Sequence, residues 1–474
     1  MALFQDPSDH VFDPAVPQIL PYEKMYLVQI GNKPFRLSGA SLSSDAPSYF
    51  TEYFSKRQNS VSATHVNADD DDALVIDRSP QIFELIYHHL QGYFVHIRDE
   101  VEFTMLYADA MYYNLPRLRA QLQHSDFYYA CIGGESFRVP RGLFWQDGNS
   151  PNYFELTYSA TYADIEHIFL SKKLIRPPPQ SPPFVNRSPA LFKDILALLS
   201  GATLKLDDEK RQSLILECRY YRLQNLEQRL LKCSVGWNPL LQRSEIILNL
   251  CDIKKAGLSL PPPSNVKGCI STPSTRTPSP KSPLDDEPVS PPPKKPKVCT
   301  EKNWAMTAYK RPFVDREFHE LLFQIDIPDV TIQFNKRSKT IHVCLSGEAA
   351  HRFEKVFGGL LLDNVVDVAT YWREPSLNSK PSRVLALPAC MSLCDFKVNG
   401  VKIRSLRMLV EDPQFTSQVP DLTSKDGATA LGIRIYLTKS LWKLGIINGE
   451  LMMVAIKAEG ISSVREHNRS LEFL

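Results

Sequence analysis

The chain contains one helix-opening motif twice. Ile76–Phe83 has the sequence Ile-Asp-Arg-Ser-Pro-Gln-Ile-Phe, and Val185–Phe192 has the sequence Val-Asn-Arg-Ser-Pro-Ala-Leu-Phe. In each copy a Ser before Pro can cap a helix, because its hydroxyl accepts from an early backbone N–H that has no partner within the helix. The Pro then takes the first helical position, where its missing N–H costs nothing. The motif therefore predicts that a helix begins at each place.

The residues after the motif repeat in the same register. Gly92 and Gly201 stand where a glycine in the left-handed conformation can end each helix. The apolar positions between motif and glycine form one helical face in both copies, namely Ile82, Phe83, Ile86, Tyr87 and Leu90, and Leu191, Phe192, Ile195, Leu196 and Leu199. Cap, proline, apolar face and stop recur together, so we infer a duplicated domain.

The duplication extends over about the first 235 residues. A strand, a glycine turn and a second strand are predicted before each motif, around Gly31 and Gly133. After the motif, Ala110–Leu115 has its counterpart in Cys218–Leu223. The middle of the second copy is longer, and the proline-rich run 177–183 predicts a loop there.

In the first copy these residues resemble a BTB/POZ domain of the potassium-channel tetramerisation type. The resemblance implies an α+β fold in each copy, with a small sheet flanked by helices. It also implies a module that self-associates and recruits partners, frequently a cullin-type ubiquitin-ligase scaffold. The matching positions are Ile30, Gly31, Phe35, Asp77, Arg78, Pro80, Phe83, Gly92, Ala110, Tyr113, Leu115 and Leu118.

The second copy departs from the pattern, because Asn186 stands where the first copy has Asp77. Our candidates for oligomer or partner contacts are Asp77, Arg78 and Arg187. If Asp77 meets a basic partner at a subunit contact, the second copy lacks that charge. Two arrangements stay open: several chains form a ring through a head-to-tail contact, or the two copies pair within one chain.

Composition limits the class of partner and the compartment. The formal net charge is +2, so no global field favours nucleic acid or an acidic membrane. The nine Cys are scattered, and residues 1–22 are interpreted as a flexible leader without a secretory signal, which predicts free thiols. No apolar run reaches the ~20 residues of a membrane helix. We expect a soluble protein of the nucleus or cytoplasm that binds neither membrane nor DNA directly.

Residues 258–300 are rich in Pro, Ser, Thr and charge, which predicts a disordered linker. Within it Lys294, Lys295 and Lys297 resemble a single-cluster nuclear import signal that an importin binds. The alternative is that these lysines only keep the linker solvated.

The same linker contains a cluster of sites for proline-directed phosphorylation. Each phosphate would add about −1.5 to −2 charge close to the lysines. Such pairs are frequent in any proline-rich stretch, but five beside a basic cluster favour regulation. The candidates are Thr272, Thr277, Ser279, Ser282 and Ser290.

The remaining residues predict a β-rich domain over 301–474 that resembles no family we recognise. Val330–Phe334 and Ile341–Leu345 predict a hairpin, Asn399-Gly400 is a strong turn signal, and 348–362 is expected to be a helix. We therefore divide the chain into a leader (1–22), a first BTB/POZ-like domain (23–125), a second (126–235), a connection (236–257), the linker (258–300) and this domain (301–474).

No catalytic signature is present, and neither a cofactor nor a metal is expected. Cys390 and Cys394 with His342 and Cys344 are better interpreted as packing residues than as a zinc site. The first hypothesis is a non-enzymatic interaction and oligomerisation scaffold, with a substrate adaptor of a cullin-type ligase as its specific form. The second is a nuclear regulator that acts by self-assembly and recruitment without ubiquitin chemistry. An unrecognised enzyme within 301–474 is the least favoured hypothesis.

Overall fold

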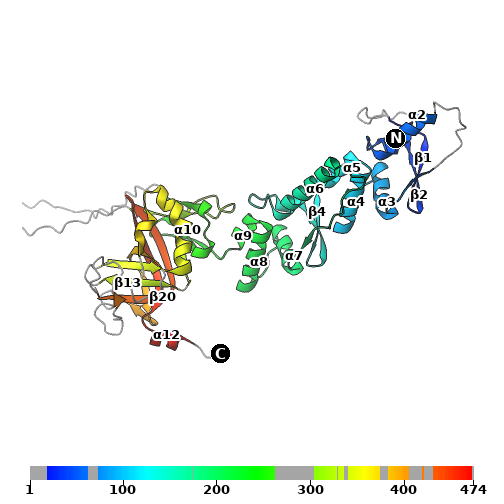
Figure 1. The fold of residues 1–474 in the computed structure, drawn as a ribbon. Helices are drawn as coiled ribbons and strands as arrows, with labels where there is room; N and C mark the ends of the chain where they lie inside the picture. Colours follow the sequence, from blue (N-terminus) through cyan, green and yellow to red (C-terminus); the bar gives the residue numbers. More distant parts are fainter. Residues whose placement is uncertain are drawn as a thin grey trace, which may run out of the picture. The chain divides into compact units, whose positions relative to one another are not determined.

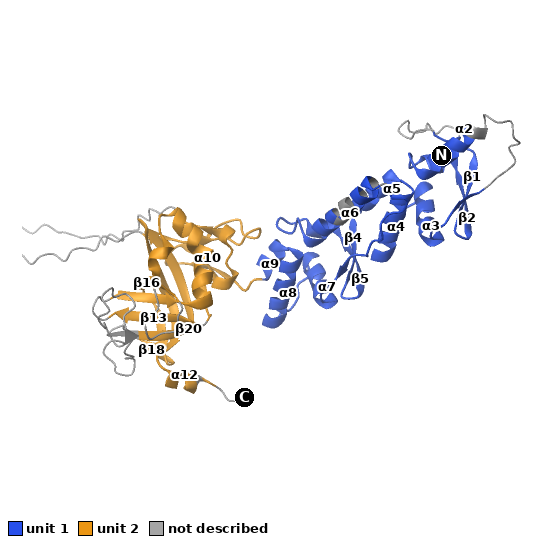
Figure 2. Ribbon diagram, viewed as in Figure 1, with its two compact units in different colours: residues 1–230 blue, residues 231–474 orange. Residues whose placement is uncertain are grey.

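The computed structural model describes residues 19–61, 73–172, 174–261, 304–327, 329–335, 340–373, 383–404, 419–420 and 431–471. Figure 1 shows the elements along the chain, and Figure 2 colours the two compact units into which they group. The first unit ends at Leu230 and the second begins at Leu231. Each unit is described by itself.

The first half of unit one contains a three-stranded sheet and helices. Strand β1 lies in the centre of the sheet, antiparallel to β2 and parallel to β3. The elements are β1 (Met25–Ile30), β2 (Lys33–Ser38), α1 (Gly39–Ser43), α2 (Tyr49–Val61), β3 (Leu74–Ile76), α3 (Pro80–Leu90), α4 (Glu100–Tyr112) and α5 (Pro116–Gln123).

The second half has the same order of strands and the same sheet pairing. Strand β4 is central, antiparallel to β5 and parallel to β6. A short 3-10 helix, Arg141–Phe144, takes the place of α1. The other elements are β4 (Phe127–Ile132), β5 (Glu135–Pro140), α6 (Tyr153–Ser171), β6 (Phe184–Val185), α7 (Pro189–Leu199), α8 (Asp208–Tyr221) and α9 (Gln224–Leu230). We call the two halves the first and the second repeat.

The helix-opening motif behaves as predicted in both repeats. The side chain of Ser79 accepts from the backbone N–H of Ile82, and the side chain of Ser188 from that of Leu191. Each helix begins at the following proline and ends before a glycine with positive φ, +81° at Gly92 and +93° at Gly201. The predicted starts and stops of α3 and α7 are therefore confirmed.

Each repeat is built around an aromatic core at corresponding positions. In the first, Phe50 stacks on Tyr113 at 4.9 Å between ring centroids, and Phe83 meets both rings edge-on. In the second, Phe154 stacks on Tyr221 at 5.5 Å beside Phe192. All six side chains are fully buried, so burial of these rings stabilises the packing of α3 and α7 on their neighbours.

Unit two contains one large sheet that closes on itself. Strands β13, β14, β16, β21 and β20 pair in turn, and β20 then pairs again with β13. This ring comprises β13 (Val330–Asn335), β14 (Thr340–Leu345), β16 (Val384–Cys390), β20 (Leu431–Ile447) and β21 (Glu450–Ile461).

Further strands extend the sheet outside the ring. Strand β12 pairs with β20, with β8 and with β11, and β17 pairs with β21. The elements outside the ring are β7 (Ser234–Asn238), β8 (Arg243–Asn249), β9 (Leu258–Ser259), β10 (Ala305–Met306), β11 (Ala308–Tyr309), β12 (His319–Ile325), α10 (Gly347–Asp363), β15 (Trp372–Arg373), β17 (Asp395–Val398), β18 (Val401–Ile403), β19 (Val419–Pro420) and α12 (Val464–Ser470).

Residues 236–257, expected to be a mere connection, belong to the second unit. They supply β8, whose buried Ile246 and Leu248 pair with β12 in parallel register. Arg352 of α10 also donates to the carbonyl oxygens of Leu250, Cys251 and Ile253, at 2.6 to 3.2 Å. The expected second domain of 126–235 is correspondingly shorter, because β7 begins at Ser234 and pairs with β8.

The expected linker of 258–300 is shorter at its start, because its first two residues form β9, and strands of the same sheet lie on both sides of the remainder. Leu258 and Ser259 of β9 pair with Tyr309 and Ala308 of β11. Residues 262–303 lie outside the described residues, and with them the import candidates Lys294, Lys295 and Lys297 and all five phosphorylation candidates. The stretch is therefore inserted within the second unit, and it does not separate two domains.

Candidate interaction surfaces

Arg78 and Arg187, two of the proposed contact residues, are engaged inside their own repeats. The guanidinium of Arg78 lies 3.5 Å from Asp109 and over the ring of Tyr112, 4.2 Å from its centroid. Arg187 repeats this arrangement with Glu217 at 3.5 Å and Tyr220 at 4.1 Å. Arg78 therefore joins the motif to α4, and Arg187 joins it to α8, each through an ion pair and a cation–π contact.

Burial alters the acids of these pairs. Burial raises the pKa of Asp109 to about 6, although the neighbouring Arg78 opposes that shift. Burial also raises the pKa of Glu217, against the effect of Arg187. Asp77 differs, because its side chain is 97% exposed and lies 3.8 Å from Arg176. Of the three candidates, Asp77 has the most accessible side chain.

The two repeats meet where the sheet of the second contacts α4 of the first. Phe103 of α4 is fully buried, and its ring stacks on Tyr129 of β4 at 5.1 Å with the planes 22° apart. Tyr158 of α6 lies against the same ring at 6.0 Å. Its hydroxyl also bonds to the backbone of Tyr129, which fixes the aromatic wall on the side of the second repeat.

Polar contacts surround this aromatic centre. The hydroxyl of Ser136 donates to the carboxylate of Glu100 at 3.2 Å, and Arg141 donates to the carbonyl oxygen of Gln123 at 2.9 Å. Glu100 is buried although it is charged. A buried aromatic centre with a hydrogen-bonded rim is typical of a specific interface.

Among the described residues, the sheet of the first repeat and helix α8 of the second do not take part in the contact between the repeats. Their residues differ from those at the corresponding positions of β4 and α4, which do meet. Leu27 of β1 occupies the position of Tyr129 and is half-buried, and its sheet neighbours Met25 and Val75 are exposed. In α8, Arg211 occupies the position of Phe103. The first repeat therefore presents a sheet face on which the apolar side chains of Met25, Leu27 and Val75 lie beside Gln29 and Arg36. The second repeat presents a helix on which a charged residue replaces the aromatic one.

A cleft of about 870 Å³ lies beside the junction of the repeats. The exposed rings of Tyr93 and Phe94 stand on one side, and Phe127 and Tyr129 of β4 line the other. The cleft is also lined by Arg117, Arg138 and three histidines, and by the acidic residue Asp126.

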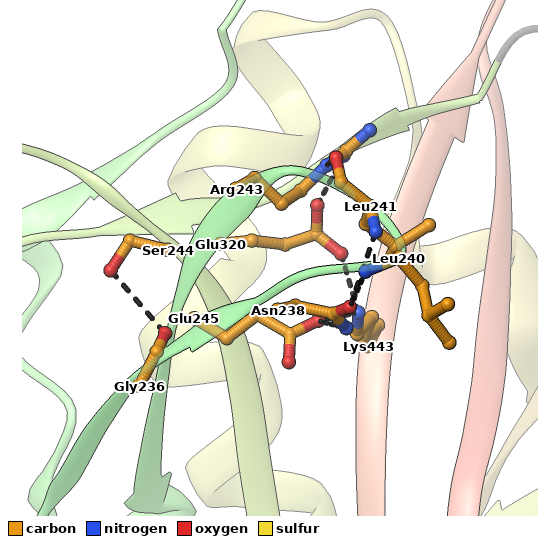
Figure 3. Close-up of polar contacts among 9 residues, drawn as sticks. All are labelled: Gly236, Asn238, Leu240, Leu241, Arg243, Ser244, Glu245, Glu320 and Lys443. Carbon is orange, nitrogen blue, oxygen red and sulfur yellow. Dashed lines mark hydrogen bonds and ion pairs between the residues drawn. The ribbon is translucent and has the colours of Figure 1, made fainter.

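In unit two, a charged cluster fixes the hairpin of β7 and β8 (Figure 3). The parallel register of β8 and β12 places Glu245 directly opposite Glu320. The Nζ atom of Lys443 lies 2.6 Å from a carboxylate oxygen of each, and Arg243 also pairs with Glu320. Two like charges are thereby held side by side through the cations around them.

Asn238 connects this cluster to the hairpin loop. Its amide nitrogen donates to Glu245 at 3.0 Å, and its amide oxygen accepts from the backbone N–H groups of Leu240 and Leu241. Desolvation raises the pKa of Glu245, but the hydrogen bonds from Lys443 and Asn238 outweigh it and leave that pKa below its ordinary value. The hairpin is thus anchored on its inner side by polar contacts.

Comparison with known proteins finds a family match in the first repeat and another in unit two. A family model described as BTB/POZ domain matches residues 27–122, and one described as YLR108C C-terminal domain matches residues 243–471. The BTB/POZ domain-containing protein YLR108C of Saccharomyces cerevisiae is 38% identical over 480 residues, which cover 97% of this chain and 96% of that protein. The chain belongs to the BTB/POZ domain-containing proteins.

A second yeast relative carries no functional description. The Saccharomyces cerevisiae protein named Uncharacterized protein YDR132C is 44% identical over 497 residues, which cover 98% of both chains. The BTB/POZ match confirms the resemblance of the first repeat, and it ends within α5. The match of residues 243–471 begins at β8, which agrees with the boundary that the structure gives for unit two.

Sequence reasoning missed most of these contacts. Phe103 is an apolar residue of α4, but its partner Tyr129 lies in the other repeat, and no local pattern connects the two. Glu245, Glu320 and Lys443 are likewise far apart in the sequence. The sequence signal for β8 is weak, because Ile246, Ile247 and Leu248 form a continuous apolar run between Glu245 and Asn249 and do not alternate with polar residues.

Neither a metal site nor a membrane helix emerges in the part of the chain that the structure describes. There, no three His, Cys, Asp or Glu side chains are grouped so that they could hold a metal ion. Among the same residues, no helix has the length and apolar character needed to cross a membrane.

Proposed function

We propose that the chain is a non-enzymatic scaffold for protein–protein interaction, in which two BTB/POZ-type repeats act as a pair. BTB/POZ proteins generally mediate protein–protein interaction, and their domains commonly self-associate. Three features support a second BTB/POZ-type repeat: the same strand order, the same helix caps, and the same contact of arginine with an acid and a tyrosine.

The observation that carries the proposal is the contact between the repeats. The sheet of the second repeat covers α4 of the first through Tyr129 and Phe103. We propose that this contact replaces one that would otherwise join two chains. Arg211 supports this interpretation, because a charged side chain at the position of Phe103 disfavours docking of a further apolar sheet on α8.

The face of the first repeat's sheet that carries Leu27 has no counterpart within the pair of repeats, so it remains available to a partner. Met25 and Val75 are exposed there and flank Leu27. Exposed apolar groups gathered on one face are typical of binding sites. We propose that this face recruits a cullin-type ubiquitin-ligase scaffold, and that unit two selects the target protein.

The alternative is a nuclear regulator that recruits partners without ubiquitin chemistry. The lysines at 294, 295 and 297 favour an importin as a partner, and phosphorylation nearby would weaken that attraction by adding negative charge. These residues lie outside the described part of the chain. The two hypotheses differ in whether a cullin binds.

Affinity purification from the organism's own cells tests the proposal. The tagged full chain and tagged residues 1–230 are each purified, and their partners are identified by mass spectrometry. We expect a cullin-type scaffold with both, and target proteins with the full chain alone. Leu27→Arg is expected to reduce the recovered cullin at least tenfold, because it replaces the central apolar side chain of the face with a second positive charge beside Arg36.

Val101→Arg is the matched control, because Val101 is an exposed apolar residue on α4 outside the proposed face. It is expected to leave recovery unchanged. Absence of any cullin from both purifications would refute the ligase adaptor and favour the nuclear regulator. Equal recovery with Leu27→Arg would place the binding surface elsewhere.

A further inference from the structure

Strand β7 is an edge strand of the large sheet in unit two. Among the described strands it pairs with β8 alone, so one side of its backbone has no ladder partner. Unpaired edges are templates for the addition of another strand. Proteins usually protect such edges with charge, proline or very short strands.

Ser234–Asn238 has none of these protections. It is five residues long and contains neither a charged residue nor a proline, and its side chains are almost all exposed. Strand β18 at another edge is shorter and carries Lys402, which pairs with Asp395. Strand β9 has only two residues. Of these edges, β7 is the one open to pairing.

Apolar side chains are concentrated on this hairpin. Val235 is 46% exposed and Trp237 65% exposed, and they point to the same face of β7 because they are two residues apart. At the tip, Leu240 is 92% exposed and Leu241 46%. The polar anchors Asn238, Glu245 and Lys443 hold the hairpin in place from within (Figure 3). The surface is therefore both apolar and rigidly supported.

The sequence of β7 is complementary to itself. If two copies pair antiparallel about Gly236, Val235 of each faces Trp237 of the other, and Ser234 faces Asn238. Aromatic with β-branched pairs are favourable cross-strand neighbours, and no like charges are opposed. A Cβ atom added at Gly236 would meet nothing within 4 Å, so a side chain at the centre of the pair is accommodated by the chain itself.

We infer that β7 is an interface between two copies of this chain, which joins their large sheets into one continuous sheet. Four partly exposed apolar side chains per copy correspond to an area on the order of 1,000 Å² for the two copies together, near the lower limit of specific interfaces. The two-fold axis passes through Gly236, and the contact is isologous.

A cysteine at the axis tests this directly. Opposed Cα atoms in antiparallel strands are about 4.5–5.5 Å apart, which lies within the range that a disulfide spans. The full chain with Gly236→Cys is expected to give a covalent dimer on mild oxidation. Leu240→Cys is the matched control, since its own counterpart would be more than about 20 Å away across the axis. We expect at least tenfold less covalent dimer from it.

A mass measurement gives a second and independent test. The wild-type chain at micromolar concentration is expected to have twice the 53.9 kDa chain mass by light scattering. Val235→Asp should reduce that to one chain, because it places a carboxylate against the ring of the partner's Trp237. Val401→Asp changes an exposed valine of β18 and should leave the dimer intact.

A single-chain mass for the wild type, or equal cross-linking at positions 236 and 240, would overturn the inference. A single-chain mass is also the result expected if β7 pairs with an extended peptide of a different protein, and it would overturn the inference in that case as well. The inference is separable from the proposed recruitment by unit one. Leu27→Arg is expected to leave the cross-link at position 236 unchanged.

Discussion

At the scale of single residues, Asp109 shows how burial and an ion pair compete. Its carboxyl group lies 3.5 Å from the guanidinium of Arg78, and burial nevertheless raises its pKa to about 6. The ordinary value is 3.8. The arginine therefore compensates only part of the cost of desolvation.

This pKa predicts a dependence of stability on pH. Between about 3.8 and 6, folded Asp109 retains a proton that the unfolded chain has released. The free energy of unfolding should therefore fall as pH rises through that window, by about 2–3 kcal/mol. Asp109→Asn should remove this slope in urea unfolding of residues 1–230, followed by circular dichroism.

Glu52→Gln is the control for that experiment, because the Glu52 side chain is 61% exposed on α2. It should leave the slope as in the wild type. Parallel profiles for wild type and Asp109→Asn would contradict the raised pKa.

At the scale of elements, Lys443 determines whether β8 and β12 can lie side by side. Their register opposes Glu245 and Glu320, and one buried ammonium group contacts both. The cation is 7% exposed, so water cannot readily replace it. Like charges directly opposite in a sheet are destabilising unless a third group intervenes.

Lys443→Met should therefore destabilise unit two by about 3–5 kcal/mol, because it leaves Glu245 without its ammonium partner and leaves the buried Glu320 with Arg243 alone. Thermal unfolding of the full chain measures this. Adding Glu320→Gln should restore part of the loss, because it removes one of the two opposed charges. Lys439→Met, at an exposed position of the same strand, is the control. An equal effect of both methionine variants would contradict a specific role of the cluster.

The elements also show what the sequence could and could not predict. Ser79, Pro80 and Gly92 define α3 by local chemistry, and the same chemistry recurs at Ser188 and Pro189, so these helices were predicted correctly. The contact of Phe103 with Tyr129 depends on how two repeats dock. Periodicity reports which face of a helix is apolar, and it does not report what covers that face.

At the scale of the whole molecule, the predicted domain boundary was wrong because local sequence patterns do not reveal which distant strands pair. The proline-rich stretch suggested a domain boundary at 258–300, because composition changes there. The actual boundary is at 230, since β8 pairs with β12 across the insertion. Pairing between strands distant in sequence leaves no local mark on either strand, and the short apolar run 246–248 of β8 does not reveal β12 as its partner.

This boundary predicts two opposite outcomes of deletion. Replacing residues 264–300 with a short Gly-Ser loop should leave the melting temperature of unit two unchanged or slightly raised, because shortening a loop reduces its closure entropy by only about 0.6 kcal/mol per halving. Deleting 236–257 should instead prevent unit two from folding, because it removes β8 from the sheet. Calorimetry of both variants checks this, and loss of the unit-two transition in the first would contradict the insertion.

The pairing of β9 with β11 also determines where the molecule can be divided. A protease that cuts between 262 and 303 would break the covalent chain and still leave both pieces held by one sheet. A gene truncated at the same place would encode a protein that contains unit one followed by β7, β8 and β9. This protein would lack β12, the strand that pairs with Ile246 and Leu248. Such a product would aggregate through its exposed strands, whereas one ending at 230 would carry none of them.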